Sequence, residues 1–185
     1  MRILLSMCVV LLSCNSLIAQ PGEGRSKELS LSGCYQNYST DESSQSRAAF
    51  LISPRLGFFV FQGFEIEPEL VAMLPSSSDI VYMLNGNISY NFIGKGKGVP
   101  FVLLGYGIAN TVPLFNVPTW KTYFGVGVLN VGGGVKAFLR EDIAIRFEYR
   151  YQRFTGEGSS QGLSYYTQRL DTRIHTVQFG LSVLL

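Results

Sequence analysis

The stretch Ile143-Ala144-Ile145-Arg146-Phe147-Glu148-Tyr149-Arg150-Tyr151 has a large apolar side chain at every odd position and Ala, Arg, Glu and Arg at the even positions. A period of two predicts a β-strand with two unlike faces. A slip of one residue would turn every charged side chain of this strand to the opposite face. The strand therefore specifies the register of its neighbours.

The overall composition favours a sheet that faces lipid. Hydrophobic residues make up 46% of the 185 residues and charged residues 15%, against about 25% charged residues in ordinary soluble domains. Beyond the first residues no apolar run approaches the ~18 residues of a transmembrane helix, so insertion into a membrane would use strands. The formal net charge of +2 gives no indication of nucleic-acid binding.

The first residues follow the plan of a secretory signal peptide, with Arg2, an apolar run over residues 3–12 and small residues up to Ala19. We expect cleavage after Ala19. The predicted organisation is then a signal peptide (1–19), a short periplasmic leader (20–28) and a barrel domain (29–185).

One cysteine near the start of the chain offers an alternative to cleavage after Ala19. Leu11-Leu12-Ser13-Cys14 loosely resembles a lipobox, so lipoprotein processing at Cys14 is the alternative. Cleavage after Ala19 leaves Cys34 as the single cysteine, which excludes an intramolecular disulfide. Cys34 is interpreted as a small strand residue rather than a reactive thiol.

Alternation of polar and apolar residues recurs eight times. The predicted strands cover residues 29–38, 49–61, 64–74, 80–92, 99–111, 122–139, 143–151 and 170–185. Longer loops follow every odd-numbered strand, at residues 39–47, 75–79, 112–121 and 155–168, and short turns follow the others. Because outer-membrane barrels have short periplasmic turns and longer outer loops, the pattern predicts an all-β, eight-stranded antiparallel up-and-down transmembrane β-barrel. Both termini would lie at the rim with the short turns.

The polar faces of these strands are assigned to the lumen. They are dominated by Ser, Asn, Gln, Gly and Thr, whereas a water-facing surface is richer in Lys and Glu. An Arg facing lipid near the midplane would cost about 2–4 kcal/mol. The predicted charge cluster of the lumen is Arg55, Glu65, Glu67, Glu69, Arg146, Glu148 and Arg150.

An eight-stranded barrel is just wide enough for side chains to fill it, so this cluster is interpreted as a salt-bridged plug. A permeation or catalytic cluster is the alternative for the same residues. A soluble lipocalin-like barrel, with the apolar faces turned inward, is the alternative for the whole fold.

Some positions predict local features of the strands. Pro54 and Pro68 should mark bulges or strand ends, because a closed barrel has no edge at which a missing N–H is harmless. The glycines from Gly125 to Gly134 indicate bulges or sharp curvature. Aromatic residues near strand ends suggest interfacial girdles, at Tyr90, Phe92, Tyr149 and Tyr151.

Two segments resemble a known family. Ile52-Ser53-Pro54-Arg55-Leu56-Gly57-Phe58-Phe59-Val60 is similar to a segment that recurs in small outer-membrane β-barrel proteins, the OmpA-like and OmpX-like barrels of the porin family. The final strand resembles the assembly signal of that family, with aliphatic residues where aromatic ones are usual, at Gln178, Gly180, Val183 and Leu185. The resemblance implies a bacterial outer-membrane location, with outer-membrane lipid and the assembly machinery as partners. It does not decide the function, because the family ranges over adhesion, envelope anchoring and narrow transport.

Catalytic and metal chemistry find little support. His175 is the single histidine, and outer-membrane lipid A deacylases pair a His with a Ser two positions on, where this chain has His175-Thr176-Val177. One His and one mature Cys provide no metal-ligand set, and no cofactor is expected. The expected role is structural, adhesive or loop-mediated, with residues 155–168 as the loop for an extracellular ligand. The alternatives are a narrow transport or small-ligand-binding barrel and a lipid hydrolase that uses His175.

Overall fold

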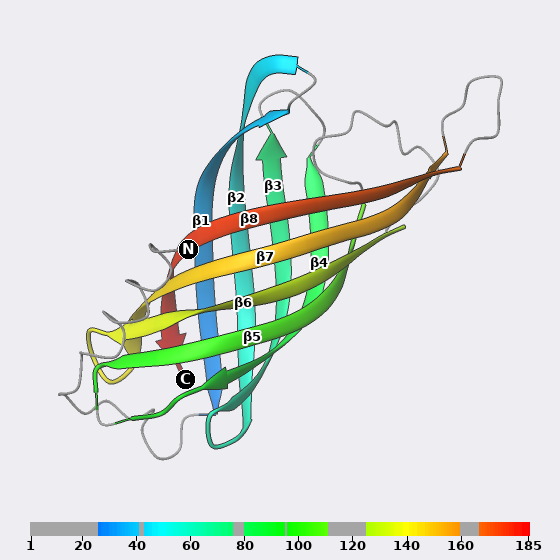
Figure 1. Cartoon of the computed structure of the whole chain (residues 1–185). Helices are drawn as coiled ribbons and strands as arrows, with labels where there is room; N and C mark the ends of the chain where they lie inside the picture. Colours follow the sequence, from blue (N-terminus) through cyan, green and yellow to red (C-terminus); the bar gives the residue numbers. More distant parts are fainter. Residues whose placement is uncertain (1–25, 41–42, 76–79, 95, 111–124, 160–166) are drawn as a thin grey trace, which may run out of the picture.

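Eight antiparallel strands form a closed barrel in which every strand pairs with its sequence neighbours and β8 returns to β1 (Figure 1). The computed structural model describes residues 26–40, 43–75, 80–94, 96–110, 125–159 and 167–185, and within these the side chains of all but residues 36–40, 43–47, 157–159 and 167–170. The strands are β1 Lys27–Thr40, β2 Ser43–Phe61, β3 Phe64–Pro75, β4 Val81–Asn91, β5 Gly98–Ala109, β6 Val126–Phe138, β7 Ile143–Ser159 and β8 Thr167–Leu184. The predicted fold class is confirmed.

Several sequence predictions lie outside the described residues. They are the signal peptide with its cleavage after Ala19, the alternative at Cys14, and the loop at residues 112–121. In the described part of the chain, no helix is long and apolar enough to cross a membrane.

Side chains alternate between the outside and the lumen along each strand. In β4, every odd-numbered residue from Val81 to Asn91 is buried and every even-numbered residue is exposed. The exposed side chains are large and apolar around the whole circumference; Leu31, Leu70 and Leu104, on three different strands, are 56%, 59% and 58% exposed. The charged side chains of β3, which are Glu65, Glu67 and Glu69, point into the lumen. The faces are therefore arranged as predicted, and the inverted, lipocalin-like alternative does not fit.

The barrel closes where β1 meets β8. Glu28 lies opposite Leu184 of β8 and Gly57 of β2. The backbone carbonyl of Lys27 accepts a hydrogen bond from the Leu185 N–H at 2.8 Å. β1 therefore begins two residues before the predicted start at Leu29, because these residues supply partners for the last strand. The C-terminus lies at the rim with the short connections (Figure 1).

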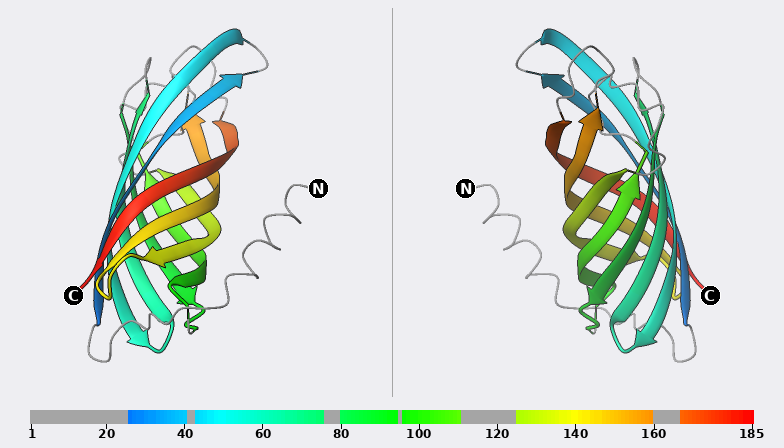
Figure 2. Two further views of the ribbon diagram at one scale, coloured as in Figure 1. Left: turned by 90° about the vertical axis from the view of Figure 1, so that its left-hand side faces the viewer. Right: turned by 90° about the vertical axis from the view of Figure 1, so that its right-hand side faces the viewer.

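Two hairpins are longer than predicted. β1 continues to Thr40 and β2 begins at Ser43, so most of the predicted loop 39–47 is strand. β7 continues to Ser159 and β8 begins at Thr167, so residues 155–159 and 167–168 of the predicted loop 155–168 are strand. The β1–β2 hairpin rises beyond the neighbouring strands (Figure 2). These segments lack the alternating hydrophobicity from which strands are predicted.

The prediction of bulges or strand ends at the two prolines of β2 and β3 is wrong. Pro54 and Pro68 lie inside these strands without a register shift. Both fall on the β2–β3 seam, whose pairing is interrupted between Ile52 and Phe58 except at Arg55. Because proline has no N–H to donate, placing both on one seam confines the lost hydrogen bonds to that seam.

The glycines of β6 form no bulge, since β6 pairs with β5 and β7 in unbroken register. At Gly132 and Gly133 an added Cβ would come within 2.8 Å and 2.9 Å of carbonyl oxygens on the neighbouring strands. Close approach of the backbones, as the predicted curvature requires, is therefore the reason for these glycines. By contrast, Gly63 serves a conformational need: it takes a φ of 80° in the predicted tight turn with Gln62 between β2 and β3.

Candidate functional site: a charged network in the lumen

Among the side chains that the structure describes, nine charged ones are buried in the lumen and connect through ion pairs into one cluster, called here the lumen network. Its members are Glu28, Arg55, Glu65, Glu67, Glu69, Lys136, Arg146, Glu148 and Arg150. The structure brings together all seven charged residues named from the sequence and adds Glu28 and Lys136. Five glutamates face four basic side chains, so the network has a formal excess of one negative charge.

The centre of the lumen network is a closed square of two arginines and two glutamates. Arg55 Nε lies 2.7 Å from Glu69 Oε1, and Arg55 Nη1 lies 2.6 Å from Glu148 Oε2. Arg150 completes the square, with Nη1 2.6 Å from Glu69 Oε2 and Nη2 2.6 Å from Glu148 Oε1. Each carboxylate thus receives both guanidinium groups. This planar, charge-assisted pairing is the form in which ionised groups are most readily buried.

Neutral side chains complete the coordination of Glu69. Ser53 donates its hydroxyl to Glu69 Oε1. The amide groups of Asn85 and Asn87 each donate to Glu69 Oε2 at 3.0 Å. These donors come from β2 and β4, which flank β3 in the sheet. A buried carboxylate that accepts this many hydrogen bonds is held in one position.

The two asparagines fit because glycines lie opposite them. Gly107 pairs with Asn85 and Gly105 pairs with Asn87 across the β4–β5 ladder. A Cβ built on either glycine would overlap the amide oxygen of its asparagine partner. Small residues on one strand therefore make room for polar side chains on the next, as a narrow, filled barrel requires.

Lys136 lies on the short-turn side of the square. Its Nζ is 2.6 Å from Glu28 Oε2 and 2.8 Å from Glu65 Oε2. It also lies 5.6 Å and 5.7 Å from the ring centroids of Phe59 and Phe101, within the range of cation–π attraction. A single ammonium group thus joins strands β1, β3 and β6 across the lumen.

Arg146 lies between the ion pairs of Lys136 and the square, and it connects the two. Its Nη2 lies 3.0 Å from Glu67 Oε2, and its Nε lies 3.0 Å from Glu148 Oε2. Its guanidinium carbon is 4.3 Å from the centroid of the Phe101 ring, a stacked arrangement that suits arginine better than lysine. The network is therefore continuous along the lumen.

The sequence reasoning missed Glu28 and Lys136 for different reasons. Glu28 falls in the predicted leader, where no strand was expected. Lys136 lies in glycine-rich β6, where the alternation of large side chains is weak. A usable signal was parity: Asn130, Lys136 and Phe138 are all even-numbered, and all three are buried in the lumen.

Two apolar layers enclose the lumen network. The larger layer lies toward the long-loop rim and consists of Cys34, Ala49, Leu51, Val71, Met73, Val81, Met83, Ala109, Val126, Val128 and Phe154, with Ile174 packed against it. The smaller layer lies toward the short turns and consists of Val99, Phe138, Ala144 and Leu184, with Phe59 packed against it.

The interior is therefore only partly polar, whereas the sequence predicted a polar, salt-bridged interior. Uninterrupted apolar runs at residues 70–74 and 80–84 are the signal for the larger layer, because strands with two apolar faces read as continuous hydrophobic segments. Cys34 is a buried, free thiol of this layer, in keeping with its interpretation as a small strand residue.

His175 lies on the outer surface of β8 rather than in the lumen. Its Nδ1 is 2.6 Å from the Tyr149 hydroxyl oxygen, and its ring centroid is 5.2 Å from that of Tyr151. Thr176 points into the lumen, and Val177, two positions on, is exposed beside it on the outside. Among the described residues, no group of three His, Cys, Asp or Glu side chains is arranged to hold a metal ion.

The four residues of the predicted assembly signal occupy different environments. Gln178 is buried, and its Oε1 accepts a hydrogen bond from Arg55 Nη2 at 2.8 Å. Gly180 lies opposite Ser32, whose hydroxyl a Cβ would overlap. Val183 is half-buried, whereas Leu185 is exposed on the outside. Their part in assembly stays a prediction.

Comparison with known proteins gives one informative result. No protein-family model and no curated protein sequence matches the chain. Among solved structures, the crystal structure of Neisserial surface protein A matches with a TM-score of 0.60, over 86% of this chain and 96% of that one. The chain shares its fold with Neisserial surface protein A. Since the sequences are 12% identical, the likeness concerns the fold alone.

Proposed function

We propose that the chain is an integral outer-membrane β-barrel protein with an occluded lumen and a structural, adhesive or hairpin-mediated interaction role. The observation that carries the proposal is the arrangement of the faces, with the lumen network buried inside and large apolar side chains exposed outside on all eight strands. In water this surface would far exceed the few hundred Å² of apolar patch that soluble monomers expose. In lipid it needs no cover, and the closed ladder satisfies the backbone.

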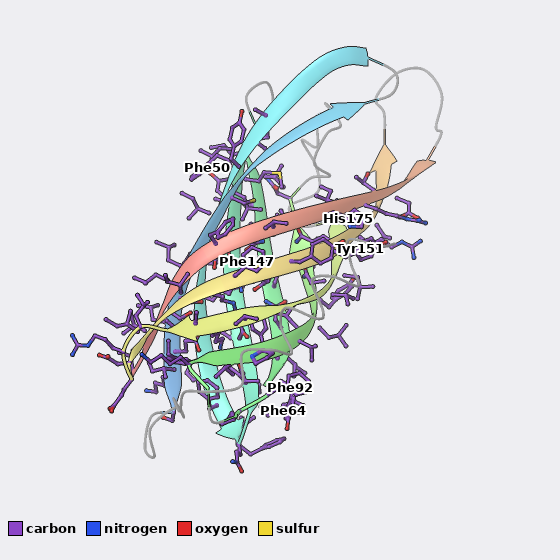
Figure 3. All side chains as sticks on the ribbon, turned by 60° about the vertical axis from the view of Figure 1, so that its left-hand side comes forward. Phe50, Phe64, Phe92, Phe147, Tyr151 and His175 are labelled. Carbon is purple, nitrogen blue, oxygen red and sulfur yellow. The ribbon has the colours of Figure 1, made fainter. Side chains whose placement is uncertain are left out.

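Strand length supports the same placement. β4 has 11 residues and β5 has 12, close to the roughly 9–11 residues with which a tilted strand spans a bilayer. Aromatic side chains gather at both ends of the apolar surface. Phe64 and Phe92 lie at the short-turn end, while Tyr151 and His175 lie together toward the other rim (Figure 3).

The filled lumen argues against transport. An ion or solute would have to separate the Arg55–Glu148 and Arg150–Glu69 pairs and then cross the larger apolar layer, which acts as a dry barrier to charge. Breaking one buried pair costs about 3–5 kcal/mol. We therefore expect no steady single-channel conductance from the purified protein in planar bilayers, and regular conductance steps would contradict the occluded lumen.

The interaction role rests on the long hairpins. β2, β7 and β8 have 19, 17 and 18 residues, well beyond the roughly 9–11 needed to span a bilayer. The excess rises at one rim and offers surface to a partner outside the membrane. An epitope tag inserted after Thr40 should be labelled on intact cells, whereas the same tag after Glu141 should be labelled only after the outer membrane is opened.

Cell fractionation with a gel-mobility assay tests the membrane placement. The full chain should be recovered in the outer membrane and should change its gel mobility on boiling. The variant Leu104→Arg, in the middle of the apolar surface, should lose folded protein, because Arg near the midplane costs about 2–4 kcal/mol. Lys97→Arg at the short-turn rim is the control. A periplasmic product that tolerates Leu104→Arg would overturn the proposal.

A further inference from the structure

A small charged patch lies on the outer surface of the barrel, at the long-loop end of β7 and β8. It consists of Arg153, Asp171 and Arg173, all exposed; the side chains of Arg153 and Asp171 are 44% and 41% accessible. Among the residues whose side chains the structure describes, this patch holds every charged group on the outside of that end. The other outward charges among these described residues, such as Lys27 and Arg140, lie at the short-turn rim.

The patch places two like charges side by side. Arg153 and Arg173 are direct partners in the β7–β8 ladder, and like charges in directly opposite positions destabilise a sheet. Asp171 forms its direct ion pair with Arg153: Arg153 Nε lies 2.9 Å from Asp171 Oδ1, and Arg153 Nη2 lies 2.7 Å from Asp171 Oδ2. The patch keeps one net positive charge beside a fixed guanidinium group.

The height of the patch matches the edge of the apolar belt. Arg153 follows Ile143 by ten residues in β7. With a rise of about 3.3 Å per residue and a tilt of about 40°, it lies roughly 25 Å above Ile143, which is about the height of the apolar band of such barrels. Tyr149 and Tyr151 precede Arg153 at alternate positions of β7, and His175 contacts both of them; Tyr151 and His175 are seen side by side in Figure 3. Aromatic residues mark the interface between hydrocarbon and headgroups.

We propose that Arg173, with Arg153 held in place by Asp171, binds the phosphate group of an anionic lipid headgroup in the leaflet at the long-loop rim. The inference rests on the proposed membrane placement. An arginine fork pairs with phosphate oxygens bidentately, and a bound phosphate removes the repulsion between the two arginines. The aromatic side chains below then pack against the acyl chains of the same lipid.

Native mass spectrometry of the protein purified from outer membranes in neutral detergent tests this. Diphosphoryl lipid A should form a specific adduct, and phosphatidylcholine should not. Arg173→Gln should weaken the adduct about tenfold, the loss of one charge-assisted contact. Arg173→Lys, which keeps the charge without the fork, should fall between the two. Arg140→Gln, at an exposed arginine of the short-turn rim, is the matched control and should bind as the wild type does.

Equal lipid A binding by the wild type and Arg173→Gln would overturn the proposal. Displacement of the lipid by millimolar inorganic phosphate would also overturn it, since the site would then be one for a free anion. The gel-mobility assay on the same samples keeps the two proposals apart. A barrel that shifts on boiling but binds lipid A regardless of Arg173 refutes the lipid site alone, whereas a chain that stays soluble without detergent refutes the membrane placement.

Discussion

The substitution Glu148→Gln removes the carboxylate on which three arginines of the lumen network converge. Glu148 receives Arg55 Nη1 and Arg150 Nη2 at 2.6 Å each, and Arg146 Nε at 3.0 Å. Glutamine has nearly the same shape, so the change tests charge and hydrogen bonding rather than packing. Its amide NH₂ group would point at guanidinium donors, which leaves hydrogen-bond donors facing donors.

Two effects act on the stability of this variant. Counting formal charges suggests a gain, because the excess of one negative charge disappears. Local geometry suggests a loss of stability, because removing one partner of a buried ion pair leaves the other charge buried and unpaired. This costs about 3–5 kcal/mol. We expect the local effect to prevail, since the nearest cations are 2.6 Å away. Such a loss is a large part of the roughly 5–15 kcal/mol that stabilises a typical domain.

Urea unfolding in lipid vesicles, followed by far-UV circular dichroism and the gel-mobility shift, measures the change. Glu141→Gln, the same substitution at an exposed turn position, is the control and should lie within about 0.5 kcal/mol of the wild type. The reasoning is refuted if Glu148→Gln also lies within that range. Combining it with Arg55→Gln should recover part of the loss, since contacting pairs couple by about 0.5–3 kcal/mol.

Three further expectations follow from the same contacts. Gly107→Ala should destabilise the barrel by about 1–3 kcal/mol through overpacking against Asn85, whereas Gly86→Ala, whose Cβ would meet its nearest neighbour at 3.9 Å, should be neutral in the same unfolding assay. Glu67→Ala and Arg146→Ala should couple by about 0.5–3 kcal/mol in a double-mutant cycle, because their charged atoms are 3.0 Å apart; additive effects would contradict this contact. Mass spectrometry of the mature chain should find Gln20 as the first residue, and a lipid-modified Cys14 would instead support lipoprotein processing.

For the lumen network, the residue pattern predicts which side chains point inward but not how they pair. Glu65, Glu67 and Glu69 share a parity in one strand, as do Arg146, Glu148 and Arg150 in another, so that their common destination follows from the alternation alone. The pairing of each arginine with a particular glutamate does not follow from the alternation. Arg55 and Glu148 are 93 residues apart in the chain, and they meet only because the ladder closes between β1 and β8.

The errors in strand limits and irregularities have a common physical origin. Residues 39–40, 43–47, 155–159 and 167–168 belong to strands, although their sequence lacks the alternation from which strands were predicted. Pro54 and Pro68 keep the register because their missing N–H groups fall on one shared seam. Pairing between strands decided both outcomes, and this pairing cannot be predicted from the residues of either strand alone.

The sequence by itself determined the number of strands, their alternating faces and the outward direction of the apolar side, because these depend on a period of two and on the cost of placing charge in lipid. The tertiary structure alone decided the closed square of Arg55, Glu69, Glu148 and Arg150. It also decided which glycines leave room for Asn85 and Asn87, and the pairing of Arg153 with Arg173 on the outside. These contacts depend on register and on closure, which are properties of all eight strands together.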